Sequence, residues 1–326
     1  MVDPRSHEVR PEDAPFHQGE RAVQTRAHVR ERLARIPPRG FRAALTEQHR
    51  TFYGQLPWLL VASVDNQLQP WASALVGAPG FVTAPDPQRL QVRARPLAGD
   101  PLQQNLQVGA ALGMLGIQLQ TRRRNRVNGV VESLDEQGFV LQVGQSFGNC
   151  NQYIQAREPT LVEPSQPSGP VQTLGAELPE RALQMITQAD TFFIASATRS
   201  AVGAGAAIHG ADISHRGGNP GFVQVTEGNL LTVPDYPGNN FFNTFGNLEL
   251  WPHAGLLFPD FDRGDLLSLT GRTDIVWEGD ELEATPGAER LLRVQITGGV
   301  LMERALPLRW TAPELSEEML ALRAAR

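Results

Sequence analysis

Apolar and polar positions follow the same order twice along this chain. In the first half, strand-length apolar runs lie at residues 58–64, 69–77, 90–95 and 110–119. In the second half, they return at residues 190–197, 210–214, 230–233 and 254–258. Each half places one short helix between its third and fourth run, and runs of this length that end at turn residues are typical of β-strands. We therefore predict a mainly β protein of the α+β class, built from two copies of one barrel.

The pattern changes before, between and after these copies. Apolar residues at near-helical spacing from Val23 onward predict an amphipathic helix that ends before Pro37, with a second helix over residues 41–53. Such an arginine-rich helix can bind a membrane surface, but interspersed glutamates dilute its charge, so we expect it to pack on the barrel or on a partner subunit. The predicted organisation is an N-terminal arm with helices (1–50), a first barrel (51–156), a Pro-rich linker or surface excursion (157–180), a second barrel (181–312) and a C-terminal helix (313–326).

Composition narrows the classes of function. The chain has 326 residues, 41% of them hydrophobic, and a net charge of −6, which argues against general nucleic-acid binding. No apolar run is long enough to predict a membrane span, and no apolar signal core follows Met1, so we expect a cytoplasmic protein. The single cysteine, Cys150, excludes an internal disulfide, and we predict no metal site. All 29 basic residues are arginine, which excludes a Schiff-base lysine.

Two turns in the second half contain residues that suit a phosphate. Ser214-His215-Arg216-Gly217-Gly218 places a guanidinium beside exposed backbone N–H groups. Further on, Gly238-Asn239-Asn240 leads into a helix-like run, where an asparagine can cap the helix and the N-terminus favours an anion. The alternative is two ordinary hairpin turns that are rich in glycine and asparagine because turns need them.

These motifs, with Pro220-Gly221-Phe222-Val223 and Gly255-Leu256-Leu257-Phe258, resemble the pyridoxamine 5′-phosphate oxidase-related flavin-binding proteins over about residues 52–271. The resemblance implies split β-barrels that hold FMN, and it implies roles for residues of the second barrel. Arg216 and the Gly217–Gly218 backbone would contact the phosphate, with Ser214 and His215 nearby. The isoalloxazine edge would be bordered by Val233, Pro234 and Asp235. The phosphate or ribityl chain would be reached by Asn239, Asn240 and Asn243.

One arginine does not neutralise a phosphate ester of about −1.5 to −2 charges. The arginine cluster at residues 122–126 of the first barrel is the natural supply of further cations, and our hypothesis is that Arg123 and Arg124 face the cofactor groove of the second barrel. In an alternating strand, Arg122, Arg124 and Arg126 share one face and Arg123 the other. The alternative is a solvated strand that protects a sheet edge. The first barrel has Gly77-Ala78-Pro79-Gly80 in place of the His-Arg-Gly-Gly turn, so we predict that its own site is degenerate.

The sequence leaves three functions open. The first is an FMN-dependent oxidoreductase that takes electrons from a reduced nicotinamide or a partner reductase, with His215 as the best acid or base because its charge can change near neutral pH. The second is a non-enzymatic protein that carries flavin or haem. The third is a structural protein with a decayed pocket. A homodimer is possible in each case.

Overall fold

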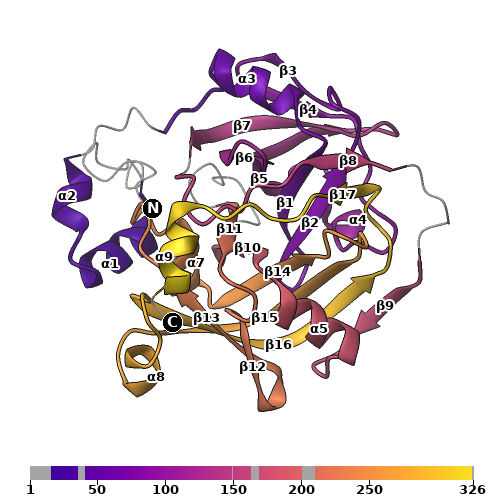
Figure 1. Ribbon diagram of the computed structural model, residues 1–326. Helices are drawn as coiled ribbons and strands as arrows, with labels where there is room; N and C mark the ends of the chain where they lie inside the picture. Colours follow the sequence, from indigo (N-terminus) through magenta and orange to yellow (C-terminus); the bar gives the residue numbers. More distant parts are fainter. Residues whose placement is uncertain (1–15, 36–40, 149, 163–168, 200–209, 325–326) are drawn as a thin grey trace.

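The computed structural model describes residues 16–35, 41–148, 150–162, 169–199 and 210–324, and its main bodies are two antiparallel sheets (Figure 1). The first sheet has the order β2-β1-β5-β6-β7-β4-β3. The second has the order β11-β10-β14-β15-β16-β13-β12, with β9 paired to β16. The predicted mainly β class with two sheet bodies is confirmed, and the two strand orders are the same.

The strands of the first sheet are β1 (Trp58–Val64), β2 (Pro70–Val76), β3 (Val82–Asp86), β4 (Arg89–Val92), β5 (Ala111–Gln118), β6 (Arg123–Leu134) and β7 (Phe139–Gly148). Those of the second are β9 (Val171–Leu174), β10 (Thr191–Ala197), β11 (Ala211–Gly217), β12 (Gln224–Thr226), β13 (Leu230–Asp235), β14 (His253–Pro259), β15 (Leu266–Val276) and β16 (Arg290–Met302). A separate pair joins β8 (Pro159–Leu161) to β17 (Leu308–Trp310). The predicted linker thus supplies two short strands, β8 and β9, because each finds a strand edge with which to pair.

The helices are α1 (Gln18–Arg26), α2 (Arg30–Ala34), α3 (Glu47–Gly54), α4 (Leu102–Asn105), α5 (Glu180–Gln188), α7 (Asn243–Leu250), α8 (Asp280–Glu283) and α9 (Glu317–Ala324), with a 3-10 turn at Glu227–Asn229. The predicted N-terminal helix is therefore two shorter helices. No helix in the described ranges is long and apolar enough to cross a membrane.

Helix α1 packs tightly on α7. A Cβ added at Gly19 would stand 2.0 Å from the carbonyl oxygen of Gly246, so the two backbones meet at a pair of glycines. His17 caps α1 through a reciprocal pair of bonds with Glu20, which fixes where this helix begins. The N-terminal segment therefore rests on the second unit of its own chain.

The two sheets correspond residue by residue. Ala62 in β1 lies opposite Gly113, and Ala195 in β10 lies opposite Gly255. The neighbouring serines repeat one further contact: Asn105 Nδ2 donates to Ser63 Oγ at 3.0 Å, and Asn247 Nδ2 donates to Ser196 Oγ at 3.1 Å. These matches align α4 with α7 and each strand of the first sheet with one of the second.

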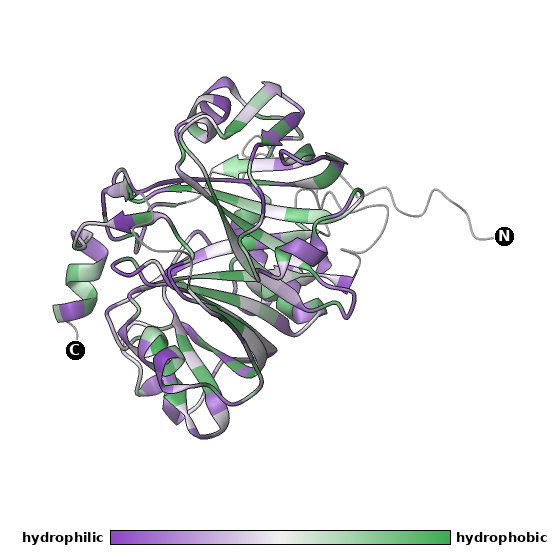
Figure 2. Ribbon diagram, turned by 90° about the vertical axis from the view of Figure 1, so that its right-hand side faces the viewer, coloured by the Kyte–Doolittle hydropathy of each residue, from purple (hydrophilic) through white to green (hydrophobic). Residues whose placement is uncertain are grey.

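The sheets pack face to face through these glycines. A Cβ at Gly113 would come within 2.4 Å of the Ala211 carbonyl oxygen, and one at Gly255 within 2.5 Å of the Pro70 carbonyl oxygen. Each contact is the counterpart of the other, because Ala211 and Pro70 occupy the same place in β11 and β2. Apolar strand segments run through the middle of both sheets in Figure 2. The two units therefore form one body with an approximate internal twofold relation.

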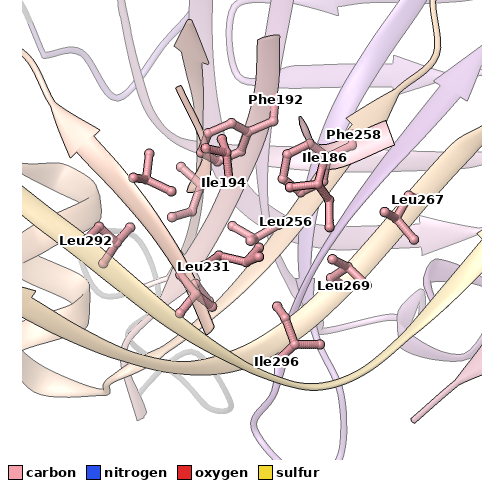
Figure 3. Close-up of a cluster of buried hydrophobic side chains, with 14 of the residues drawn as sticks. Ile186, Phe192, Ile194, Leu231, Leu256, Phe258, Leu267, Leu269, Leu292 and Ile296 are labelled. Atoms are coloured by element: carbon pink, nitrogen blue, oxygen red, sulfur yellow. The ribbon is translucent and has the colours of Figure 1, made fainter. Parts of the chain in front are cut away.

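The interior of the second unit is filled with apolar side chains. Phe192, Ile194, Leu231, Leu256 and Ile296 converge from four strands and are almost fully buried (Figure 3). Close packing of this kind leaves no space for a ligand inside the barrel. A binding site must therefore lie at the rim of the unit or between the units.

Candidate functional site

An open pocket lies between the two units. Its walls come from β6 and residues 150–153 of the first half, and from β11, β13 and the start of α7 in the second. The predicted site residues that line it are Arg124, Ser214, His215, Arg216, Gly217, Pro234, Asp235, Asn239, Asn240 and Asn243. The structure thus brings two arginines of the first half's cluster, Arg124 and Arg126, to the motifs of the second half.

Arg124 is the cation of this pocket that lacks a carboxylate partner within the described ranges. Its Nε donates to the carbonyl oxygen of Cys150 at 2.5 Å. Burial, together with the charges of Arg126 and Arg216, lowers the pKa of Arg124 to about 9. The guanidinium stays protonated at neutral pH, and its destabilised charge would be offset by an anion.

Arg126 lies two residues further along the same face of β6. Its Nη1 donates to Asp212 Oδ2 at 2.6 Å and to Asn243 Oδ1 at 3.2 Å. Its Nη2 donates to Ser214 Oγ, which also bonds Thr244 Oγ1 at 2.9 Å. Arg126 therefore ties β6 to β11 and to the first turn of α7, and its charge is largely matched by Asp212.

Arg216 reaches the pocket from β11, but unlike Arg124 it has a carboxylate partner. It pairs with Asp235 on β13, and Arg290 pairs with the other oxygen of the same carboxylate at 3.3 Å. Arg290 also pairs with Glu289. Around the pocket, four guanidiniums thus face the three carboxylates Asp212, Asp235 and Glu289, which leaves one positive charge among the described residues.

Helix α7 begins at Asn243, later than predicted. Its N-cap is Phe242, which has a left-handed backbone (φ 61°) and gives no side-chain cap. Asn239 instead accepts the Phe241 N–H at 3.1 Å, and Asn240 lies at a left-handed turn (φ 61°). The first N–H groups of α7 have no partner within the helix. The predicted asparagine cap is therefore wrong, and the helix start faces the pocket without a cap.

His215 of β11 also lines this pocket, from the opposite face of the strand to Ser214 and Arg216. The residue is 5% exposed, and its Nε2 has no hydrogen-bond partner in the described structure. Burial lowers the pKa of His215 well below its usual range, and Arg124 and Arg216 lower it further. The imidazole is thus neutral at neutral pH, so the reason for which it was predicted as an acid or base does not hold. A buried nitrogen without a partner is a contact that a ligand can complete.

Three predicted residues lie elsewhere. The Val233 side chain is 2% exposed and belongs to the apolar core. The Gly218 N–H donates to the Asp190 carbonyl oxygen at 3.0 Å, so it is already used within the chain. Arg123 lies on the opposite face of β6, with its guanidinium 5.4 Å from the ring of Phe52 in α3. Gly217 lines the pocket, but its lack of a side chain makes room for the Tyr153 carbonyl oxygen, 2.1 Å from an added Cβ.

Two aromatic rings and one buried acid were missed. Tyr153 and Tyr236 line the pocket with ring centroids 5.5 Å apart. Glu20 of α1 lies behind it and accepts from Asn243 Nδ2 at 2.5 Å, and burial raises the pKa of Glu20 to about 8. Arg126 was not predicted as a site residue, although it shares a face of β6 with Arg124 and the alternation of the strand could have identified it. No local pattern connects Glu20 or Tyr153 to this site. Within the described ranges, no three His, Cys, Asp or Glu side chains gather as a metal site.

The fold and pocket define a two-sheet β protein with an arginine-lined pocket between its halves. No family model and no curated protein matches the chain. A putative pyridoxamine 5′-phosphate oxidase from Lactobacillus delbrueckii is similar in structure, with 9% identity and a TM-score of 0.31, over 38% of this chain and 93% of that one.

A pyridoxamine 5′-phosphate oxidase-related, FMN binding protein from Nostoc punctiforme has 10% identity and a TM-score of 0.29, over 44% of this chain and 100% of that one. HupZ of Group A Streptococcus has 11% identity and a TM-score of 0.29, over 36% and 90%. Each covers less than half of this chain. Pyridoxamine 5′-phosphate oxidase-related proteins are thus among its structural neighbours, as the motifs indicated.

Proposed function

We propose that this chain is an FMN-binding flavoprotein whose pocket holds the phosphate of FMN between Arg124 and the start of α7. The observation that carries this proposal is Arg124, a half-buried guanidinium with no carboxylate partner in the described ranges that faces an uncapped helix start. An anion gains from both groups, since charge-assisted hydrogen bonds and the helix N-terminus act in the same direction.

Other residues of the pocket suit the parts of FMN beyond its phosphate. His215 Nε2 is buried without a partner in the described structure, and Ser214 and Asn243 add polar groups to the pocket lining. Tyr153 and Tyr236, which also line the pocket, supply aromatic ring surface. A pocket with a cationic end, a few polar groups and aromatic walls is suited to a phosphate ester that carries a flat ring.

For the activity, we favour an oxidoreductase that receives electrons from a reduced nicotinamide or from a partner reductase. FMN supplies the redox chemistry when bound, and the chain supplies binding and orientation. His215, held neutral by burial, would offer a hydrogen bond rather than exchange a proton near neutral pH. That same neutrality favours a second candidate, a flavin carrier without turnover. Bleaching of bound flavin by NADH separates the two.

The proposal is tested by titrating the chain with FMN and with riboflavin, which lacks the phosphate. Hydrogen bonds to a charged group are worth about 1.5–3 kcal/mol, so FMN should bind at least about tenfold more tightly than riboflavin. Equal affinity for the two would contradict a phosphate site, and the absence of binding to either would contradict the flavoprotein.

A further inference from the structure

The two units differ at the positions of Arg124 and Arg126, which therefore depart from the internal twofold relation. The strand registers place Ser268 at the position of Arg126, and Leu266 at the position of Arg124. Leu266 is fully buried, and Ser268 Oγ donates to the Ala72 carbonyl oxygen at 2.9 Å. At these two positions the second unit therefore offers the first no cation, whereas the first offers Arg124 and Arg126 to the second.

The starts of the corresponding helices α4 and α7 also differ. Asp100 Oδ1 accepts the Leu102 N–H at 2.8 Å and the Ser73 hydroxyl at 2.6 Å, so α4 begins at a carboxylate of the chain itself. The residues that correspond to Ser73 and Asp100 are Ser214 and Phe242. At α7, Ser214 bonds the Thr244 hydroxyl and the Arg126 guanidinium, and the N-cap residue Phe242 makes no side-chain hydrogen bond to the helix. Asp100 thus places a negative charge at the start of α4, whereas Phe242, at the corresponding position, places none at the start of α7.

The position beside Asp100 is also closed. A Cβ at Gly99 would stand 2.4 Å from Cγ1 of Val171, because β9 from the predicted linker packs over Gly99. Asp100 is 2% exposed, and burial raises its pKa to about 6, so it is mainly ionised at neutral pH. A ligand would have to displace both a buried carboxylate and the strand that covers it.

We propose that one chain binds one anionic ligand, in the second unit only, because Asp100 occupies in the first unit the place that the ligand's anion takes in the second. This inference rests on the proposed function for the position of the ligand, and it adds the stoichiometry and the reason for it. It also makes the site a product of both units, since Arg124 and Arg126 come from the first unit and Arg216 and helix α7 from the second.

Equilibrium dialysis of the full chain against FMN, with inorganic phosphate as a second probe, tests the inference. We expect saturation at one FMN per chain, and saturation at two would overturn the inference while leaving the flavoprotein intact. One phosphate bound per chain without any FMN would support the inference and overturn the proposed function. A chain that binds neither probe would overturn both.

A matched pair of serine variants tests the asymmetry. Ser214→Ala removes a hydroxyl from the pocket and should weaken FMN binding about tenfold. Ser73→Ala removes the corresponding hydroxyl from the first unit and should lower the melting temperature while FMN affinity stays within about twofold. Equal losses of affinity in the two variants would overturn the inference. If Ser214→Ala does not fold, the stoichiometry of the parent chain decides.

Discussion

Arg126 of the first sheet donates to Asp212 of the second across 2.6 Å, and both side chains are almost fully buried. This ion pair joins β6 to β11 at the floor of the pocket. Because Arg126 also bonds Ser214 and Asn243, one side chain holds a strand and a helix start of the second unit in place. The wall that carries Arg124 is thereby fixed relative to the groove it faces.

Removal of one partner of this pair should be costly. Asp212→Ala leaves Arg126 charged and buried, and such a change costs about 3–5 kcal/mol of unfolding free energy. Urea denaturation measures the loss. Arg89→Gln provides the control, since Arg89 pairs with Glu132 at an exposed site, where solvent screens the pair and almost no loss is expected. A loss for Asp212→Ala no larger than that of the control would show that the pair does not hold the units together.

Glu20 should make stability depend on pH. Its pKa is raised by burial to about 8, from about 4.3 in an unfolded chain. The folded protein therefore binds the proton more tightly, and the stabilisation present below about pH 4 is lost as pH rises through about 8. The slope reaches about 1.4 kcal/mol per pH unit at most. In urea titrations from pH 5 to 8, Glu20→Gln should remove this part of the slope. Parallel curves for the variant and the parent would exclude an ionisable buried Glu20.

The glycines between the sheets should not tolerate a side chain. Gly113→Ala places a methyl group 2.4 Å from a backbone oxygen of β11, so the sheets must separate. Overpacking of this kind costs about 1–3 kcal/mol. Gly175→Ala is the control, because a Cβ there meets nothing within 4 Å. Thermal unfolding should show a clear loss for the first variant and almost none for the second, and an unchanged midpoint for both would contradict the packing.

The strands were predicted well where an apolar run of strand length ended at a recognisable turn. The apolar run at residues 58–64 is β1 with the same bounds, because it is buried on both faces and ends at a turn. The repeat of that pattern also predicted the second sheet. The start of α7 was placed too early, because Phe242 takes a left-handed backbone that no residue preference indicates.

Both Arg123 and Arg124 were predicted to face the groove, although the alternation of β6 allows only one of them to do so. Arg124 and Arg126 share the face that meets the pocket, and Arg123 faces α3, as the period of a strand requires. The pairing of Arg216 with Asp235 could not be read locally, since it joins strands 19 positions apart in the chain. Glu20 is more distant still, 223 positions from Asn243, and only the folded chain brings the two together.

The central claim is that Arg124 binds the phosphate of FMN. The most direct test is the ratio of FMN to riboflavin affinity, measured by flavin fluorescence, in the parent chain, in Arg124→Gln and in Arg123→Gln. The two variants remove one charge each from opposite faces of the same strand. We predict that Arg124→Gln lowers the preference for FMN about tenfold or more, while Arg123→Gln keeps it. An Arg124→Gln protein that retains the full preference for FMN would contradict the claim.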